Sequence, residues 1–249
     1  MLADLAYRRV NLEHAAASLP NVLQTLLLVA MIGVALMAVS GPEVTAGWVH
    51  PASAVLVVMY VYGLRLAQRA KVRPMWHPQR TEETVEDEPD PDAGSGRPIG
   101  LLWFHFGWMA ATVAVVGYLV GRAGITVVQE TALSGSVVGG LFTSVVTSLP
   151  ELITVLTAVR IGAMTLAVSD IVGGNTFDML FIAAADLWFT GGSVYHFADR
   201  GSVFLLSLSV VLTAMLAAGM VSRERRFIGF EGVAILVTYA VGVVALFSF

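Results

Sequence analysis

No cysteine occurs in the 249 residues, and charged residues make up only 13% of the chain. Without cysteine the protein forms neither a disulfide nor a thiolate metal site. The sequence also contains no H-E-x-x-H zinc pattern, no G-x-x-x-x-G-K-[ST] phosphate loop and no G-x-S-x-G hydrolase elbow. Asp4 and Glu13 precede the first apolar segment, which speaks against a cleavable signal peptide. The enzyme classes that depend on these motifs are therefore excluded.

Hydrophobic residues make up 57% of the chain, and its mean hydropathy of +0.78 is typical of a membrane protein. A helix of about 20 apolar residues crosses the hydrocarbon core of a bilayer. The apolar segments here are that long, whereas the strands of a membrane barrel are shorter and alternate in polarity. We predict an all-α polytopic membrane protein with seven transmembrane helices, at residues 20–40, 48–68, 99–120, 133–159, 162–188, 202–221 and 227–248.

One polar linker, residues 72–98, divides the chain. It contains the acidic run T-E-E-T-V-E-D-E-P-D-P-D-A-G-S-G, which has no apolar periodicity. We interpret it as a solvated hinge between two membrane bundles; a metal-sensing role for its acids is the alternative. The predicted organisation is the end of a first repeat in 1–71, a cytoplasmic linker in 72–98, and a second repeat in 99–249.

Basic residues predict the orientation. Five of them flank the end of the second span, whereas the connection at 41–47 has none. Because Lys and Arg are enriched in cytoplasmic loops, the loop at 69–98 is predicted to be cytoplasmic. Counting spans from there places the N-terminus inside and the C-terminus outside, although Arg122 and Arg200 oppose this orientation weakly. The five basic residues are Arg65, Arg69, Lys71, Arg73 and Arg80.

An internal repeat supports the same topology. The segment A-D-L-A-Y-R-R-V-N-L-E-H begins at Ala3, and A-D-L-W-F-T-G-G-S-V-Y-H begins at Ala185, so His14 and His196 align at the same offset. The spans that follow the two segments also align. A repeat of five spans has an odd number of crossings, so its second copy is inverted, as in many secondary transporters. By this offset the first copy is expected to be without its opening three spans.

Two carboxylates, Glu151 and Asp178, lie in otherwise apolar segments, which makes them functional-site hypotheses. Around Glu151, a continuous helix would place three hydroxyl residues on the same face, and Pro150 would free backbone carbonyls near them. Oxygen ligands of this kind suit a hard cation. The alternative is a Pro kink whose hydroxyls bond back to the helix. The hydroxyl residues are Thr147, Ser148 and Thr154.

The next span repeats the pattern. Asp170, Gly174 and Asp178 are spaced by four residues, and Asn175 lies three residues before Asp178. They share a helix face. Gly173 and Gly174 would allow a neighbouring helix to approach, so a small-residue packing face is the alternative. For Asp170, a solvated position near the inner end of the span is the alternative.

These patterns resemble those of the sodium/calcium exchanger family, the cation/Ca²⁺ antiporters. That family repeats G-T-S-x-P-E on one helix and G-S-N-x-F-N/D on the next. The counterparts here are V-T-S-L-P-E, at Val146–Glu151, and G-G-N-T-F-D, at Gly173–Asp178. By this resemblance Glu151 would bind Ca²⁺ directly. The other residues of the Ca²⁺ and the Na⁺ or H⁺ sites would be Thr147, Ser148, Asn175 and Asp178.

The sequence departs from the family pattern in three ways. In the first motif, Val146 replaces the Gly. Gly174 replaces a Ser that usually contributes to a monovalent-ion site, so the coupling ion stays open between Na⁺, H⁺ and K⁺. The family's site also takes one Glu from each repeat, whereas Glu13 and Glu43 lie outside the predicted spans. The partner motif is therefore expected in a missing N-terminal repeat or in a second chain.

The resemblance implies a secondary active antiporter of the cell membrane that exports Ca²⁺ in exchange for Na⁺ or H⁺. It implies a transporter rather than an enzyme, with no bound cofactor and no nucleic-acid partner. Its partners would be the two ions and the lipid bilayer. The alternatives are a half-transporter subunit that needs a second polypeptide and a membrane scaffold that keeps the fold without transport.

Overall fold

The structure, a computed structural model, describes residues 18–72, 98–161, 163–221 and 230–249. Within these ranges every regular element is a helix. Five helices are long and apolar enough to span a membrane, and a broken helix pair makes a sixth if it counts as one span. The predicted all-α polytopic membrane fold is confirmed. The last predicted span, 227–248, is a shorter apolar helix in the described part of the chain.

The chain forms two compact units: residues 1–85 with 151–249, and residues 86–150. In the part of the chain that the structure describes, the first unit contains two helices from the N-terminal part and five helical elements from the C-terminal part; α8 reaches it from Glu151 onward. These elements are α3 (Leu19–Ser40), α4 (Pro51–Val72), α8 (Leu149–Arg160), α9 (Met164–Trp188), the 3-10 helix η2 (Val194–Phe197), α10 (Arg200–Val221) and α11 (Phe230–Leu246).

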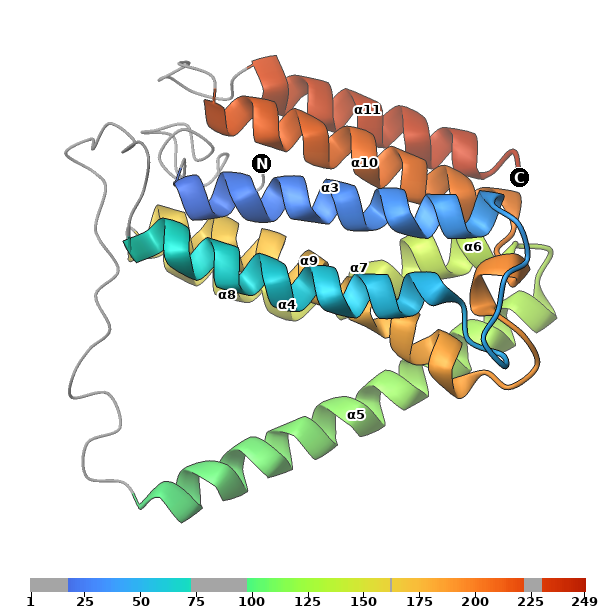
Figure 1. The fold of residues 1–249 in the computed structure, drawn as a ribbon, viewed down its shortest axis with the longest axis horizontal. Helices are drawn as coiled ribbons and strands as arrows, with labels where there is room; N and C mark the ends of the chain where they lie inside the picture. The colour runs from blue at the N-terminus through green and yellow to red at the C-terminus, as the bar shows by residue number, and fades with distance from the viewer. Residues whose placement is uncertain (1–17, 73–97, 162, 222–229) are drawn as a thin grey trace. The chain divides into compact units, whose positions relative to one another are not determined.

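Helix α3 is at the centre of the first unit. It packs against α4, α9 and α10, while α11 packs on α10 and α4 also packs on α9 (Figure 1). The start of α3 follows from its sequence, because the Ser18 side chain accepts a hydrogen bond from the Asn21 N–H at 3.2 Å. Its fully buried Met31 contacts a cluster that includes Leu56 of α4 and Met179 of α9. This cluster is the main apolar core.

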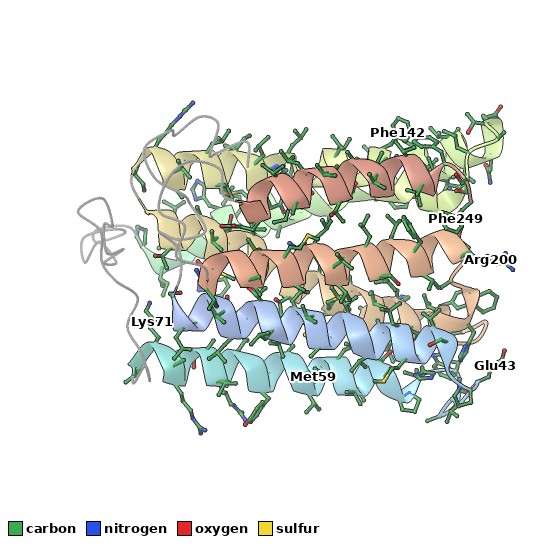
Figure 2. The ribbon with its side chains drawn as sticks, turned by 90° about the horizontal axis from the view of Figure 1, so that it is seen from above. Glu43, Met59, Lys71, Phe142, Arg200 and Phe249 are labelled. Atoms are coloured by element: carbon green, nitrogen blue, oxygen red, sulfur yellow. The ribbon has the colours of Figure 1, made fainter. Side chains whose placement is uncertain are left out.

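The helices of the first unit alternate in direction. Figure 2 shows Glu43, Arg200 and Phe249 at one end of the bundle and Lys71 at the other. Helix α10 therefore begins at the end where α3 finishes, and the two run in opposite directions (Figure 1). Both are 22 residues long. Opposed directions are what an inverted relation between these two helices requires.

The second unit contains α5 (Ile99–Glu130), the three-residue α6 (Gly135–Val137), the π-helix η1 (Val138–Thr143) and α7 (Ser144–Thr147). Helix α5 packs against η1, and a Cβ on Gly124 would lie 3.2 Å from the Thr143 hydroxyl. The predicted span at 99–120 is too short by ten residues. The helix continues through G-R-A-G-I-T-V-V-Q-E, a segment that contains no Pro to end it.

Several sequence predictions fall outside the described residues. They are the aligned Asp4 and His14 of the repeat, and most of the linker 72–98, with its basic residues Arg73 and Arg80.

Candidate functional site

The predicted span at 133–159 is broken beside the acid. Helix α7 ends at Thr147, Ser148 has φ −90° and ψ 1°, and α8 begins at Leu149. Pro150 therefore occupies the first turn of a new helix, where its missing N–H and fixed φ are tolerated, rather than the interior of a continuous one. The prediction of one unbroken helical face from Thr147 through Thr154 was wrong on this point.

The break gives Glu151 a specific setting. It lies in the first turn of α8, where the positive end of the helix dipole favours a carboxylate. Thr147 donates to the Thr143 carbonyl at 3.1 Å, so its hydroxyl bonds back to its own helix. Thr147 and Ser148 belong to the second unit, whereas Glu151 opens the C-terminal part of the first.

The π-helix η1 precedes this break and was not predicted. It covers V-G-G-L-F-T, and the Ser144 hydroxyl donates to the Gly140 carbonyl at 2.6 Å. Single π turns inside helices occur frequently at functional sites. The pair of glycines in this segment was the only sequence signal for an irregular turn.

On α9 the predicted residues share an exposed face. Asn175 and Asp178 are both exposed, and the Asn175 amide donates to the Ile171 carbonyl at 2.9 Å. A Cβ added to Gly173 or Gly174 would meet no heavy atom within 4 Å. The small-residue packing alternative therefore finds no packing partner in the described part of the chain.

Glu151 and Asp178 lie on α8 and α9 of the same unit. Both side chains are exposed, and the two carboxylates are close enough to interact electrostatically. Among the described residues, no side chain or backbone group donates a hydrogen bond to either carboxylate. The two acids therefore lie close enough to repel each other, and neither accepts a hydrogen bond from the described residues. Such a pair has its oxygen lone pairs available to a cation.

No three His, Asp or Glu side chains of the described residues come together as a metal-binding group. The letters S-x-P-E recur at Ser40–Glu43, but there α3 ends at Ser40 and Glu43 is exposed in the turn that follows. Glu43 therefore lies outside the spans, as predicted, and is not a helical counterpart of Glu151.

A hydrogen-bonded cluster that sequence reasoning missed surrounds another acid, Asp186, near the end of α9. This side chain is fully buried. One carboxylate oxygen accepts hydrogen bonds from the Ser53 hydroxyl at 2.7 Å and the His50 N–H at 2.8 Å. The other accepts from the Ser193 hydroxyl at 2.8 Å and the Val194 N–H at 2.9 Å. Asp186 thus joins the start of α4 to η2.

The surroundings of Asp186 are consistent with an ionised acid. Because Ser53 donates to Asp186, Tyr195 must be the donor in its 3.2 Å contact with the Ser53 hydroxyl. Burial raises the pKa of the Tyr195 hydroxyl, which keeps that donor protonated. The His50 ring accepts from the Ala52 N–H at 3.0 Å through Nδ1. Burial, and then the neighbouring His196, hold the pKa of His50 below its ordinary value, with Asp186 opposing them.

The comparison with protein families decides the identity of this arrangement. The sequence model of the sodium/calcium exchanger protein family matches residues 101–248, which include both acid-bearing helices. The chain belongs to the sodium/calcium exchanger family. It is a cation/Ca²⁺ exchanger-type membrane transporter. No curated protein and no solved structure matches the exchanger significantly.

Proposed function

We propose that this exchanger moves Ca²⁺ out of the cell in exchange for Na⁺ or H⁺, by alternating access around Glu151 and Asp178. The observation that carries the proposal is the facing pair of exposed carboxylates in two apolar helices, with no internal hydrogen-bond donors among the described residues. An acid at membrane depth is costly unless it has a function or a partner. A divalent cation supplies that partner and neutralises both charges.

Three further residues are predicted from the sequence as oxygen donors for the transported ions. The Asn175 side-chain carbonyl and the hydroxyls of Thr147 and Ser148 are oxygen donors of the kind that Ca²⁺ and Na⁺ take. Asn175 lies on the exposed face of α9 beside Asp178. Thr147 and Ser148 flank the break that precedes α8. Irregular backbone at membrane depth is tolerated where it lines a cavity.

The proposed location is the cell membrane, with residues 69–98 in the cytoplasm and the C-terminus outside. The basic residues after the second span support this orientation. Lys71 and Phe249 lie at opposite ends of the first unit, as two segments on opposite sides of the membrane would (Figure 2).

The test is Ca²⁺ uptake into proteoliposomes by the purified chain. Glu151→Gln keeps the volume of the side chain and removes its charge, so uptake should fall to background. Glu43→Gln is the matched control, because Glu43 is exposed in a turn outside the spans. Imposed Na⁺ and H⁺ gradients would identify the coupling ion. Wild-type rates for Glu151→Gln would contradict the site.

A second candidate is a transporter whose site is completed by another polypeptide. It is favoured by the T-S-x-P-E pattern, which occurs once in the sequence, whereas the family's site takes one Glu from each repeat. In that case the chain alone should show no uptake, and co-expression with three spans that carry a second motif should restore it. Uptake by the chain alone would exclude this candidate.

A further inference from the structure

A third carboxylate, Asp170, lies on α9 about two turns of helix before Asp178 and has a contact of its own. Its Oδ2 accepts a hydrogen bond from the Thr154 hydroxyl at 2.6 Å. Within the described residues this is the only hydrogen bond between side chains that joins α8 to α9. Asp170 is exposed, as a solvated acid would be, and no basic side chain pairs with it in the described part of the chain, so Thr154 is its side-chain partner there.

Thr154 differs from the other hydroxyl residues of these two helices. Thr157 donates to the Ile153 carbonyl, Ser169 to the Leu166 carbonyl, and Thr176 to the Val172 carbonyl, each within its own helix. Ser and Thr hydroxyls in helices commonly donate to a carbonyl of the preceding turn in this way.

Thr154 also lies 2.9 Å from a carbonyl of its own helix, that of Glu151. A hydroxyl has one hydrogen, so the two acceptors compete for it. A short bond to an ionised carboxylate is stronger than a bond to a neutral carbonyl. Asp170 therefore competes for the Thr154 hydrogen and draws it across to α9.

The Thr154–Asp170 bond lies between the apolar contact of α8 with α9 and the two proposed ion-site acids. Val155, Ala158 and Val159 of α8 form a buried apolar cluster with Ala163 and Ala167 at the start of α9. The Thr154–Asp170 bond comes next along both helices, before the two ion-site acids.

The remaining distances are short on one helix and longer on the other. Glu151 is three residues, or about 4.5 Å of helix rise, from Thr154, and Asp178 is eight residues, or about 12 Å, from Asp170. Among the described residues, the Thr154–Asp170 bond is thus the side-chain hydrogen bond that links α8 to α9 next to the two proposed ion-site acids.

We propose that Asp170 is a positioning residue of the exchanger: through Thr154 it fixes the separation and register of Glu151 and Asp178 without binding the ion itself. This inference rests on the proposed function for its consequence in transport, but the geometry it asserts can be measured without transport. Weakening the bond should let the α8 and α9 acids move apart. Ca²⁺ affinity should then fall, while the acids themselves remain intact.

The direct test measures the distance between α8 and α9 in the full chain. The protein has no native cysteine, so Ile153→Cys and Phe181→Cys, two exposed positions near the acids, provide a spin-label pair without background. Thr154→Val, which removes the hydroxyl at nearly constant volume, should broaden and lengthen the distance distribution. Thr154→Ser, which keeps the hydroxyl, should leave it as in the wild type.

Matched controls remove a hydroxyl from each helix without touching the bond. They are Thr157→Val and Ser169→Ala, whose hydroxyls bond only within their own helices. Both should preserve the wild-type distance. An unchanged distance in both Thr154→Val and Asp170→Asn, or an equal change in the controls, would overturn the proposal whether or not the protein transports Ca²⁺.

Transport supplies the second measurement. Thr154→Val should raise the KM for Ca²⁺ by about tenfold, the loss expected for one charge-assisted hydrogen bond, with a smaller change in kcat. Thr154→Val with Asp170→Asn should match the more damaging single variant, because both remove the same bond. Loss of uptake in Asp170→Asn with an unchanged helix distance would show that Asp170 binds the ion, and would overturn the positioning role.

If the wild-type chain shows no uptake at all, the proposed function fails, and the distance measurement still decides the positioning role.

Discussion

The buried Asp186 and the exposed pair of Glu151 and Asp178 all lie in apolar helices of one unit, yet their surroundings are opposite. Asp186 accepts four hydrogen bonds and is fully buried. Glu151 and Asp178 accept none from the described residues and face each other's charge. The first acid is satisfied by the protein, whereas the other two have no donor among the described residues and form the proposed cation site.

The difference shows that an acid in an apolar helix can be either structural or available to a ligand. A carboxylate whose lone pairs are all taken by protein donors stabilises the fold, because each charge-assisted bond is short and strong. A carboxylate with free lone pairs lacks that stabilisation and has its oxygens available to a ligand. The number of donors around each acid, rather than its depth in the membrane, separates the two roles.

The largest effect is expected at Asp186. Asp186→Ala removes the acceptor from the His50 and Val194 N–H groups, which cannot turn away as hydroxyls can. Leaving buried donors unpaired and breaking a buried charged network should lower the free energy of unfolding by about 3–5 kcal/mol. Thermal unfolding in detergent measures this loss. Ser193→Ala, which removes one of the four donors, should cost about 1 kcal/mol, and an equal stability for both variants would contradict the assigned role.

The next largest effect is expected from alanine substitutions of two glycines, one in a packed region and one in an open region. A Cβ on Gly63 of α4 would clash with the Leu27 side chain of α3, whereas a Cβ on Gly174 would meet nothing within 4 Å. Gly63→Ala should therefore destabilise by about 1–3 kcal/mol through overpacking. Gly174→Ala, its control, should stabilise by roughly 0.5–1 kcal/mol from helix propensity. Unfolding of both variants under one condition measures the contrast, and a cost at Gly174 would mean that its face is packed.

Much of this contrast could not be read from the sequence. The long spans were predicted because hydrocarbon thickness fixes their length, and Glu151 and Asp178 stood out because charge is rare there. The surroundings of Asp186 depend on bringing Ser53 and Ser193 to it from two distant segments, which no local pattern encodes. The Thr154–Asp170 bond depends in the same way on how α8 packs against α9.

The break at Ser148 was anticipated only in part. Pro150 signalled a disturbance, but a Pro in the first turn of a helix and a Pro that kinks one leave the same letter in the sequence.

A smaller, pH-dependent effect is expected beside Asp186. The pKa of His50 is held below its ordinary value of 6.5 by burial and by His196, against the opposing charge of Asp186. A base with a lowered folded-state pKa contributes stability that is full above pH 6.5 and declines as pH falls below that value. Wild-type protein should therefore lose more stability between pH 7.5 and 5.5 than His50→Asn, which keeps an acceptor for the Ala52 N–H. Identical pH profiles for the two proteins would exclude His50 as the cause.

For protein without bound Ca²⁺, the smallest effect on stability is expected at the proposed ion site. Neither Glu151 nor Asp178 accepts a hydrogen bond from the described residues, so Glu151→Gln and Asp178→Asn should change the free energy of unfolding by no more than about 0.5 kcal/mol in chelator. Ca²⁺ should then distinguish them from the wild type. A ligand that binds only the folded state at a hundred times its Kd adds about 2.7 kcal/mol of stability. Thermal unfolding in chelator and in saturating Ca²⁺ tests both parts: a large loss in chelator would make these acids structural like Asp186, and an equal gain from Ca²⁺ in Glu151→Gln would place the ion elsewhere.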